Sequence, residues 1–146
     1  MNLSQHPLVK QIITMQAHQA SAVAALAAGD LRTAITKLDA AVAIEDSIDA
    51  LSQPPYPVVP AHELYGTLLM QMKRPADAAK HFAETLKRAP GRPLAVYGIA
   101  RAAEALGDRA TAVDRYTEFL ELWKHADPGR PELGHARRFL ARVKAP

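Results

Sequence analysis

The 146-residue sequence contains no cysteine and few aromatic residues. Without cysteine, the chain can form neither a disulfide framework nor a thiolate metal site, and this absence is compatible with a reducing compartment. Aromatic residues make up 5% of the chain and hydrophobic residues 49%, with alanine and leucine supplying much of the apolar content. Alanine and leucine favour helices, and the runs of β-branched and aromatic residues that mark strands are missing. We therefore expect an all-α protein.

The sequence also lacks a long apolar run and a large excess of charge. No window approaches the roughly 20 apolar residues that a membrane helix needs, and the opening segment MNLSQHPLVK does not have the pattern of a signal peptide. The formal net charge of +3 is too small to imply nucleic acid, because nucleic-acid-binding faces carry clustered Lys and Arg. We expect a soluble, cytoplasmic protein that binds neither membranes nor nucleic acid.

Recognisable catalytic and metal-binding motifs are absent as well. The chain has no Gly-rich phosphate loop, no Gly-x-Ser-x-Gly and no cysteine nucleophile. His18 and His62 occupy equivalent places in successive helical segments, which puts them about 10 Å apart, too far to share one zinc ion. His125, Asp127 and His135 lie near one loop, where solvated side chains are the simpler interpretation. We expect no enzymatic activity, no metal and no cofactor.

One phrase occurs twice in the sequence. The segments LAAGDLRTAITKL (26–38) and ALGDRATAVDRY (105–116) both place Gly-Asp between two helical patterns, with Thr-Ala one turn later. Glycine suits the left-handed end of a helix, and aspartate can cap the start of the next one. In MKRPADAAKHF, Lys73 takes the glycine place and Pro75 falls in the first turn of a helix, where proline is well tolerated. These three segments predict three helix–turn–helix units.

Alignment on Gly29, Lys73 and Gly107 produces four columns of matching residues. Small residues occur seven positions before and five after each turn, and large apolar residues occur nine and thirteen after it. In this order the columns contain Ala22, Gly66 and Ala100; Ala34, Ala78 and Ala112; Leu38, Phe82 and Tyr116; Val42, Leu86 and Leu120. Small residues let two helices approach closely, and large residues fill the space between neighbouring units, which must stack to bury their apolar faces.

The second and third turns are 34 residues apart, and this helix–turn–helix unit with its columns resembles the tetratricopeptide repeat family. The segment PAHELYGTLLMQMKRPADA also resembles bacterial members of unassigned function. The resemblance implies a right-handed helical-repeat solenoid in a single domain, residues 1–146, with three units and a capping helix. The units cover about 15–48, 59–92 and 93–126, and the capping helix about 131–144.

The coarse map places helices over about 7–28, 31–47, 60–72, 75–89, 93–106, 109–125 and 131–144. A proline-rich insertion at about 50–59 separates the first two units, as either a structural strap or a docking site. The last helix carries a basic cluster composed of Arg130, Arg137, Arg138, Arg142 and Lys144. We interpret this cluster as the polar face of a terminal helix, with contact to an acidic partner or nucleic acid as the alternative.

The first helices of such units line a concave groove that recognises extended segments of other proteins. The exposed groove positions inferred from the columns are Gln19, Val23, Glu63, Thr67, Met70, Gln71, Tyr97, Arg101 and Glu104. Tyr97 and Arg101, one turn apart, form the best anchor pair, because Tyr and Arg are frequent hot spots. Family members that bind chaperone C-termini use several cationic residues here, and Arg101 is the one cation at the matching positions, which disfavours that ligand.

The sequence therefore predicts a non-catalytic adaptor or scaffold that binds a protein or peptide segment in its groove. One alternative is a structural role as a homodimer, in which the first helix pairs with a second copy through Ile12 and Ile13. Another alternative is that the chain is the regulatory part of a larger assembly.

Overall fold

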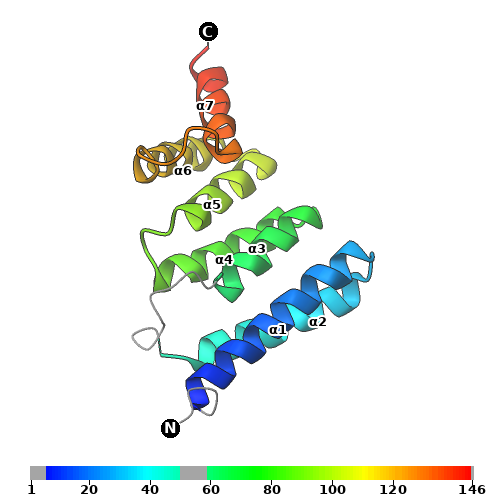
Figure 1. Cartoon of the computed structure of the whole chain (residues 1–146). Helices are drawn as coiled ribbons and strands as arrows, with labels where there is room; N and C mark the ends of the chain where they lie inside the picture. Colours follow the sequence, from blue (N-terminus) through cyan, green and yellow to red (C-terminus); the bar gives the residue numbers. More distant parts are fainter. Residues whose placement is uncertain (1–5, 50–58, 146) are drawn as a thin grey trace. The chain divides into compact units, whose positions relative to one another are not determined.

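The computed structural model describes residues 6–49 and 59–145 and forms α-helices with no strand in these ranges (Figure 1). The helices are α1 (Pro7–Ala27), α2 (Leu31–Ser47), α3 (Ala61–Gln71), α4 (Pro75–Arg88), α5 (Pro93–Leu106), α6 (Arg109–Leu122) and α7 (Pro131–Lys144). The expected all-α class is confirmed, and most helix ends match the expected ones within one residue. The exception is α6, which ends at Leu122 because the chain continues in turns that lead to α7.

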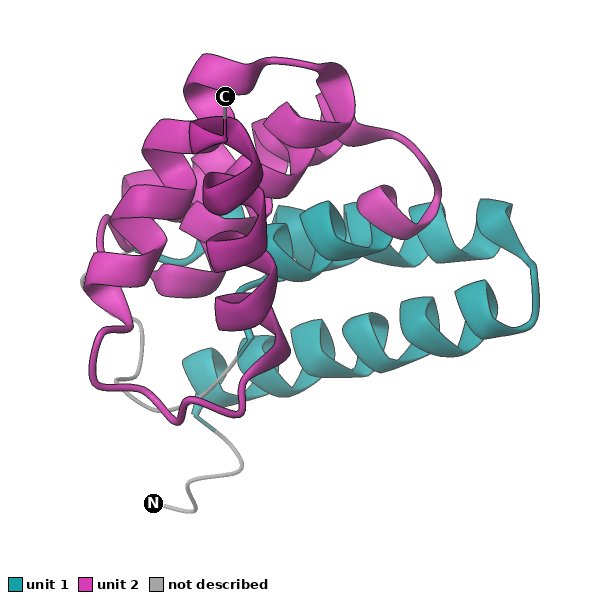
Figure 2. Ribbon diagram, turned by 90° about the horizontal axis from the view of Figure 1, so that it is seen from above, with its two compact units in different colours: residues 1–68 teal, residues 69–146 magenta. Residues whose placement is uncertain are grey.

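The chain divides into two units, residues 1–68 and residues 69–146 (Figure 2). The first unit contains α1, α2 and most of α3, and α1 packs against α2. The second unit contains the end of α3 and the four following helices. In it each helix packs against the next one in the chain, α4 on α5, α5 on α6 and α6 on α7. Consecutive helices therefore pack together at α1–α2 in the first unit and from α4 to α7 in the second.

The three turns that align in the sequence share one backbone geometry. Gly29, Lys73 and Gly107 have φ angles of 78°, 61° and 77°, and no other described residue has a positive φ. At each turn the residue after this position donates its N–H to the carbonyl five residues earlier, at 2.9 Å in all three cases. The turn residue itself donates to the carbonyl three residues earlier at 3.0 to 3.1 Å. This pair of bonds is the Schellman motif, which satisfies carbonyl groups left over at a helix C-terminus.

The residue after each turn position begins the next helix. The carboxylates of Asp30 and Asp108 accept the backbone N–H of Thr33 and Thr111 at 3.0 and 3.1 Å, as N-cap residues do. These hydrogen bonds lower the pKa of both aspartates. The side chain of Arg74 caps no N–H group at the start of α4. This helix begins with Pro75, which has no N–H group to be capped.

The four sequence columns have consistent burial. The first three columns, two of small residues and one of large residues, are buried in all three helix–turn–helix segments. The residues of the fourth column, Val42, Leu86 and Leu120, are partly buried in all three segments. The spacing of small and large residues therefore predicted correctly which positions lie inside.

In the second unit, a glycine determines how closely α4 and α5 approach. A Cβ atom built on Gly98 of α5 would lie 2.5 to 2.6 Å from three ring atoms of Phe82 on α4. Phe82 is buried, so its ring has little room to move. Further along, Tyr116 and Phe119 of α6 and Leu133 of α7 are buried in one apolar cluster.

In the first unit, a buried carboxylate connects α2 to α3. The two oxygens of Glu45 accept the backbone N–H groups of Ala61 and His62, each at 2.9 Å. His62 Nε2 lies 2.9 Å from Asp46 Oδ1, and Tyr65 Oη donates to Asp39 Oδ1 at 2.7 Å. Glu45 thus caps the start of α3 from a position 16 residues earlier in the chain. The strap and docking interpretations of the proline-rich insertion fall mostly on residues 50–58, outside the described residues.

None of the helices in the described ranges combines the length and apolar character needed to cross a bilayer.

Candidate functional site

The candidate site lies in the second unit, where α5 carries three of the predicted groove residues. Arg101 is exposed, whereas Tyr97 and Glu104 are partly buried. Arg101 Nη1 donates a long hydrogen bond of 3.5 Å to Tyr97 Oη. The structure therefore brings the predicted anchor pair into contact, with the guanidinium of Arg101 as its solvent-facing part.

The ring of Tyr97 is a packing element of the second unit. Its centroid lies 5.0 Å from that of Phe119 and 5.9 Å from that of Tyr116, both on α6. The ring also meets His135 of α7 edge-on at 6.0 Å. Edge-to-face and tilted arrangements at these distances are stabilising. Removing the ring would therefore damage the fold, and only the hydroxyl group can be altered as a test of binding.

Glu104 connects α5 to the two helices that follow it. Its Oε2 accepts a 2.5 Å hydrogen bond from Tyr116 Oη and lies 2.9 Å from His135 Nε2. His135 Nε2 is also 3.2 Å from Tyr116 Oη. Arg142 Nη2 is 3.7 Å from the second carboxylate oxygen of Glu104. One carboxylate on α5 thus contacts a buried phenol on α6 and two side chains on α7.

The electrostatics of this cluster favour an ionised Glu104. Burial alone would raise the pKa of its carboxyl, but hydrogen bonds from Tyr116 and His135 outweigh burial and lower the pKa. Burial and the neighbouring carboxylate raise the pKa of Tyr116 far above its ordinary value. At neutral pH the pair is therefore a carboxylate and a neutral phenol that donates to it, an arrangement suited to holding α7 against α5 and α6.

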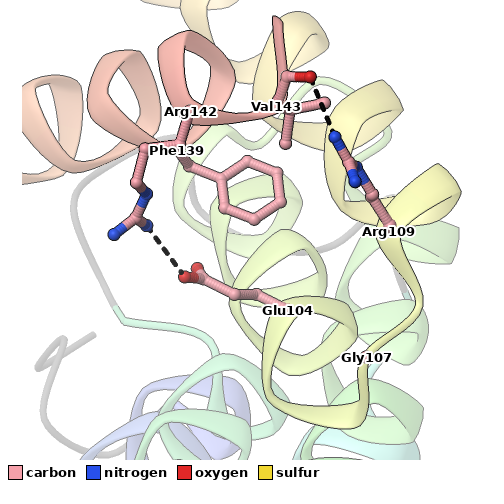
Figure 3. A pocket seen from close by; sticks show the side chains of 6 residues that line it. All are labelled: Glu104, Gly107, Arg109, Phe139, Arg142 and Val143. Carbon is pink, nitrogen blue, oxygen red and sulfur yellow. Dashed lines mark hydrogen bonds and ion pairs between the residues drawn. The ribbon is translucent and has the colours of Figure 1, made fainter. Parts of the chain in front are cut away.

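A pocket of about 320 Å³ opens beside this cluster (Figure 3). The residues that line it are Glu104, Gly107, Arg109, Phe139, Arg142 and Val143. The ring of Phe139 and the side chain of Val143 supply its apolar part. Arg109 donates to the backbone carbonyl of Val143 at 2.8 Å, and Arg142 lies at the edge beside Glu104. The pocket therefore combines an apolar wall with two guanidinium groups and the carboxylate of Glu104.

The predicted groove residues of the first unit are placed differently from expectation. Gln19 is 7% exposed and Glu63 4% exposed, so the expectation that both are exposed groove residues is wrong. Gln19 Nε2 donates to the carbonyl of Val59 at 2.8 Å, which occupies its side chain in holding the chain that leads into α3. Val23, 46% exposed, and Thr67 do reach solvent.

The remaining groove residues lie at the end of α3, in the second unit. Gln71 is exposed and Met70 is partly buried. The column alignment placed the groove residues on the right helices but did not distinguish exposed side chains from buried ones.

Sequence reasoning missed Glu45 and the role of His135. Glu45 acts on α3 from α2, and no local spacing marks such a long-range cap. From the sequence, we interpret His135, with His125 and Asp127, as a solvated side chain near a loop. The structure places it against Glu104 and Tyr116. Asp127 instead accepts the N–H of Gly129 at 2.9 Å, and no group of three His, Asp or Glu side chains suited to a metal ion occurs in the part of the chain that the structure describes.

Comparison with known proteins gives no function for this chain, so a function must be argued from the geometry described above. No protein-family model matches the chain, and no curated protein matches it in sequence.

Proposed function

We propose that the chain is a helical-repeat solenoid of the tetratricopeptide type that acts as a non-catalytic protein-interaction module. It has three helix–turn–helix units and a capping helix, and it binds an extended peptide segment through the exposed faces of the first helices of these units. The observation that carries the proposal is the triple recurrence of one Schellman turn at Gly29, Lys73 and Gly107, with the small residues around it buried at equal offsets. Repeated units of this kind present a continuous row of similar helix faces to a ligand.

The binding face in the second unit centres on Arg101. Its guanidinium is exposed and is held at one end by Tyr97 Oη, which is itself fixed by the rings of α6 and α7. A partly ordered arginine next to an aromatic hydroxyl can hydrogen-bond a peptide carbonyl or carboxylate with a smaller loss of side-chain entropy than a free arginine. In the first unit, Val23 and Thr67 are the exposed groove residues.

The test is selection of peptides from a random library on the immobilised full chain, followed by fluorescence anisotropy of the selected peptides. We expect Arg101→Glu to weaken binding by about tenfold or more, as loss of a hot spot does. Tyr97→Phe should weaken binding by a smaller factor, because it removes the hydroxyl and keeps the ring. The matched control is Lys80→Glu, the same charge reversal at an exposed position on α4.

Two results would overturn the proposed function. One is a selection that yields no peptide with a dissociation constant below about 1 mM, roughly −4 kcal/mol. The other is equal weakening by Arg101→Glu and Lys80→Glu, which would indicate general electrostatic attraction without a defined face.

Exposed apolar side chains on α1 favour a second function, self-association. Ile13 is 55% exposed, and Val23 lies ten residues further along the same helix. Ile12, which the sequence also suggested for a dimer contact, is buried in the first unit. Light scattering of wild type and Ile13→Glu tests this function: a dimer that the substitution converts to monomer supports it, and a wild-type monomer at all concentrations contradicts it.

A further inference from the structure

In the basic cluster on and before α7, most of the cationic side chains lack a carboxylate partner among the described residues, and Arg142 has a distant one in Glu104. Residues 130–144 contain five Lys and Arg side chains and one carboxylate, Glu132. On α4 and α6, several lysine and arginine side chains are paired with an acid three residues away on the chain, as in Lys87 with Glu84 and Arg115 with Glu118. Among the described residues, Arg137, Arg138 and Lys144 have no such partner.

Two of these cations, of which Arg142 lines the pocket, lie one turn apart on α7 and repel each other. Arg138 and Arg142 are four residues apart, where like charges on a helix destabilise it. Within the described ranges, the acid that pairs with Arg142 is Glu104, at 3.7 Å, and the side chain of Arg142 remains 70% exposed. An anion bound beside both residues would relieve this repulsion, and the weak contact with Glu104 costs little to exchange.

The pocket beside Arg142 limits what that anion can be. Its volume of about 320 Å³ and its wall of Phe139 and Val143 suit one apolar side chain (Figure 3). Base stacking needs an exposed aromatic face. One face of Trp123 is covered by Arg130, whose guanidinium lies 4.5 Å from the ring centroid. These features favour a peptide over a nucleic acid.

We propose that this face of α7 is a second docking surface, one for an acidic peptide segment. An apolar side chain of the peptide enters the pocket over Phe139, while carboxylates on either side of it pair with Arg138 and Arg142. This surface goes beyond the proposed function, because it is on α7 and recognises a different ligand chemistry from the groove face at Arg101.

The test uses the full chain and a fluorescein-labelled seven-residue peptide with one leucine flanked on both sides by Asp and Glu. Matched probes are the same peptide with serine for leucine, the same peptide with lysine for its acids, a single-stranded oligonucleotide, and vesicles containing anionic lipid. We expect the leucine peptide to bind, with an affinity that falls as salt screens the charges. The serine peptide should bind severalfold more weakly, and the lysine peptide should not bind.

Charge-reversal variants locate the surface. Arg138→Glu with Arg142→Glu should weaken binding of the leucine peptide by about tenfold or more, the effect of losing two charge pairs. Lys80→Glu with Lys87→Glu makes the same change of charge on α4 and should leave binding within about twofold. Far-ultraviolet circular dichroism confirms that both double variants keep their helices.

Three results would overturn the proposal: no binding of the leucine peptide, equal loss of binding in the two double variants, or equal binding of the leucine and serine peptides. Tighter binding of the oligonucleotide or the vesicles than of the leucine peptide would also overturn it and would assign the surface to that class of partner.

Discussion

At the scale of single residues, the sequence predicted interior positions well and long-range polar contacts poorly. The buried columns follow from the size of side chains at fixed offsets, which is a local property. Glu45 and Gln19 act on backbone groups far away in the chain, so nothing near them in the sequence marks their role. The role of Gly98 could be predicted from the sequence in part. A glycine inside a helix costs about 1 kcal/mol relative to alanine, which signals a packing reason without identifying Phe82 as the neighbour.

The first prediction concerns Gly98. We expect Gly98→Ala to lower the free energy of unfolding by about 1–2 kcal/mol, because the new methyl group would overlap the buried ring of Phe82. Helix propensity alone would predict the opposite, because alanine stabilises a helix relative to glycine.

Gly134→Ala is the matched control. A Cβ atom built on Gly134 would lie 3.1 Å from the flexible end of the Arg138 side chain, which can move aside. The higher helix propensity of alanine should therefore keep the stability unchanged or raise it. Urea unfolding measures both variants, and a Gly98→Ala protein as stable as wild type would contradict the packing described for α4 and α5.

The second prediction concerns Glu45. Glu45→Ala leaves two N–H groups at the start of α3 without their acceptor, and it should cost about 2–3 kcal/mol of stability. Glu45→Gln retains one acceptor oxygen and should cost less. Glu118→Ala removes a partly exposed ion pair with Arg115 and should change stability by no more than about 0.5 kcal/mol. Thermal and urea unfolding of the three variants check this order, and equal stability of Glu45→Ala and Glu118→Ala would show that Glu45 is not a structural cap.

At the scale of elements, turn chemistry explains why helix boundaries were predictable. The Gly-Asp pairs end one helix with a left-handed residue and start the next with a carboxylate cap, and both functions belong to the residues themselves. The end of α6 was less predictable, because the chain continues there in turns and has no Gly-Asp pair to mark the boundary. The contacts of α7 could not be predicted from the sequence either, because Glu104, Tyr116 and His135 lie on three different helices.

The third prediction concerns the turn at Lys73, the one left-handed residue in the described ranges that is not glycine. Lys73→Gly removes the steric cost of a side chain there, about 1–2 kcal/mol, against a smaller gain of freedom in the unfolded chain. We expect a net stabilisation of about 0.5–1 kcal/mol. Gly107→Ala makes the opposite change in an equivalent turn with open space around it and should destabilise by a similar amount. Destabilisation by Lys73→Gly in urea unfolding would contradict the shared turn geometry.

The fourth prediction concerns acid sensitivity of the packing around α7. Because the folded chain lowers the pKa of Glu104, the ionised carboxylate contributes stability that is fully present above its ordinary value of 4.5. That contribution is lost as the pH falls through the lowered folded-state pKa. Glu104→Gln should therefore be less stable than wild type at pH 7, and the difference should shrink below pH 4.5.

Trp123 is the one tryptophan of the chain and stacks on Phe119 of α6, so its fluorescence reports urea unfolding of the second unit at each pH. Glu118→Gln, at a partly exposed position of α6, serves as the control. A stability difference between wild type and Glu104→Gln that stays constant from pH 7 to acid pH would contradict the role assigned to the carboxylate.

At the scale of the whole molecule, an all-α chain could be predicted from what the sequence lacks and from its recurring turns. Its function is less accessible to sequence reasoning, because binding depends on which side chains remain exposed after packing. Gln19 and Glu63 fit the groove pattern and are buried, whereas Val23, Thr67 and Arg101 fit the pattern and are exposed. The pocket at Phe139 depends on the path of α7, and the spacing of residues carries no information on that path.

The most direct test of a peptide-binding function is an amide chemical-shift titration of the isotope-labelled full chain with a library-selected peptide. The account predicts shifts on the exposed faces of the first helices, including Val23, Thr67 and Arg101, and small shifts on α4. Shifts confined to α7, or spread evenly over the surface without saturation, would contradict it.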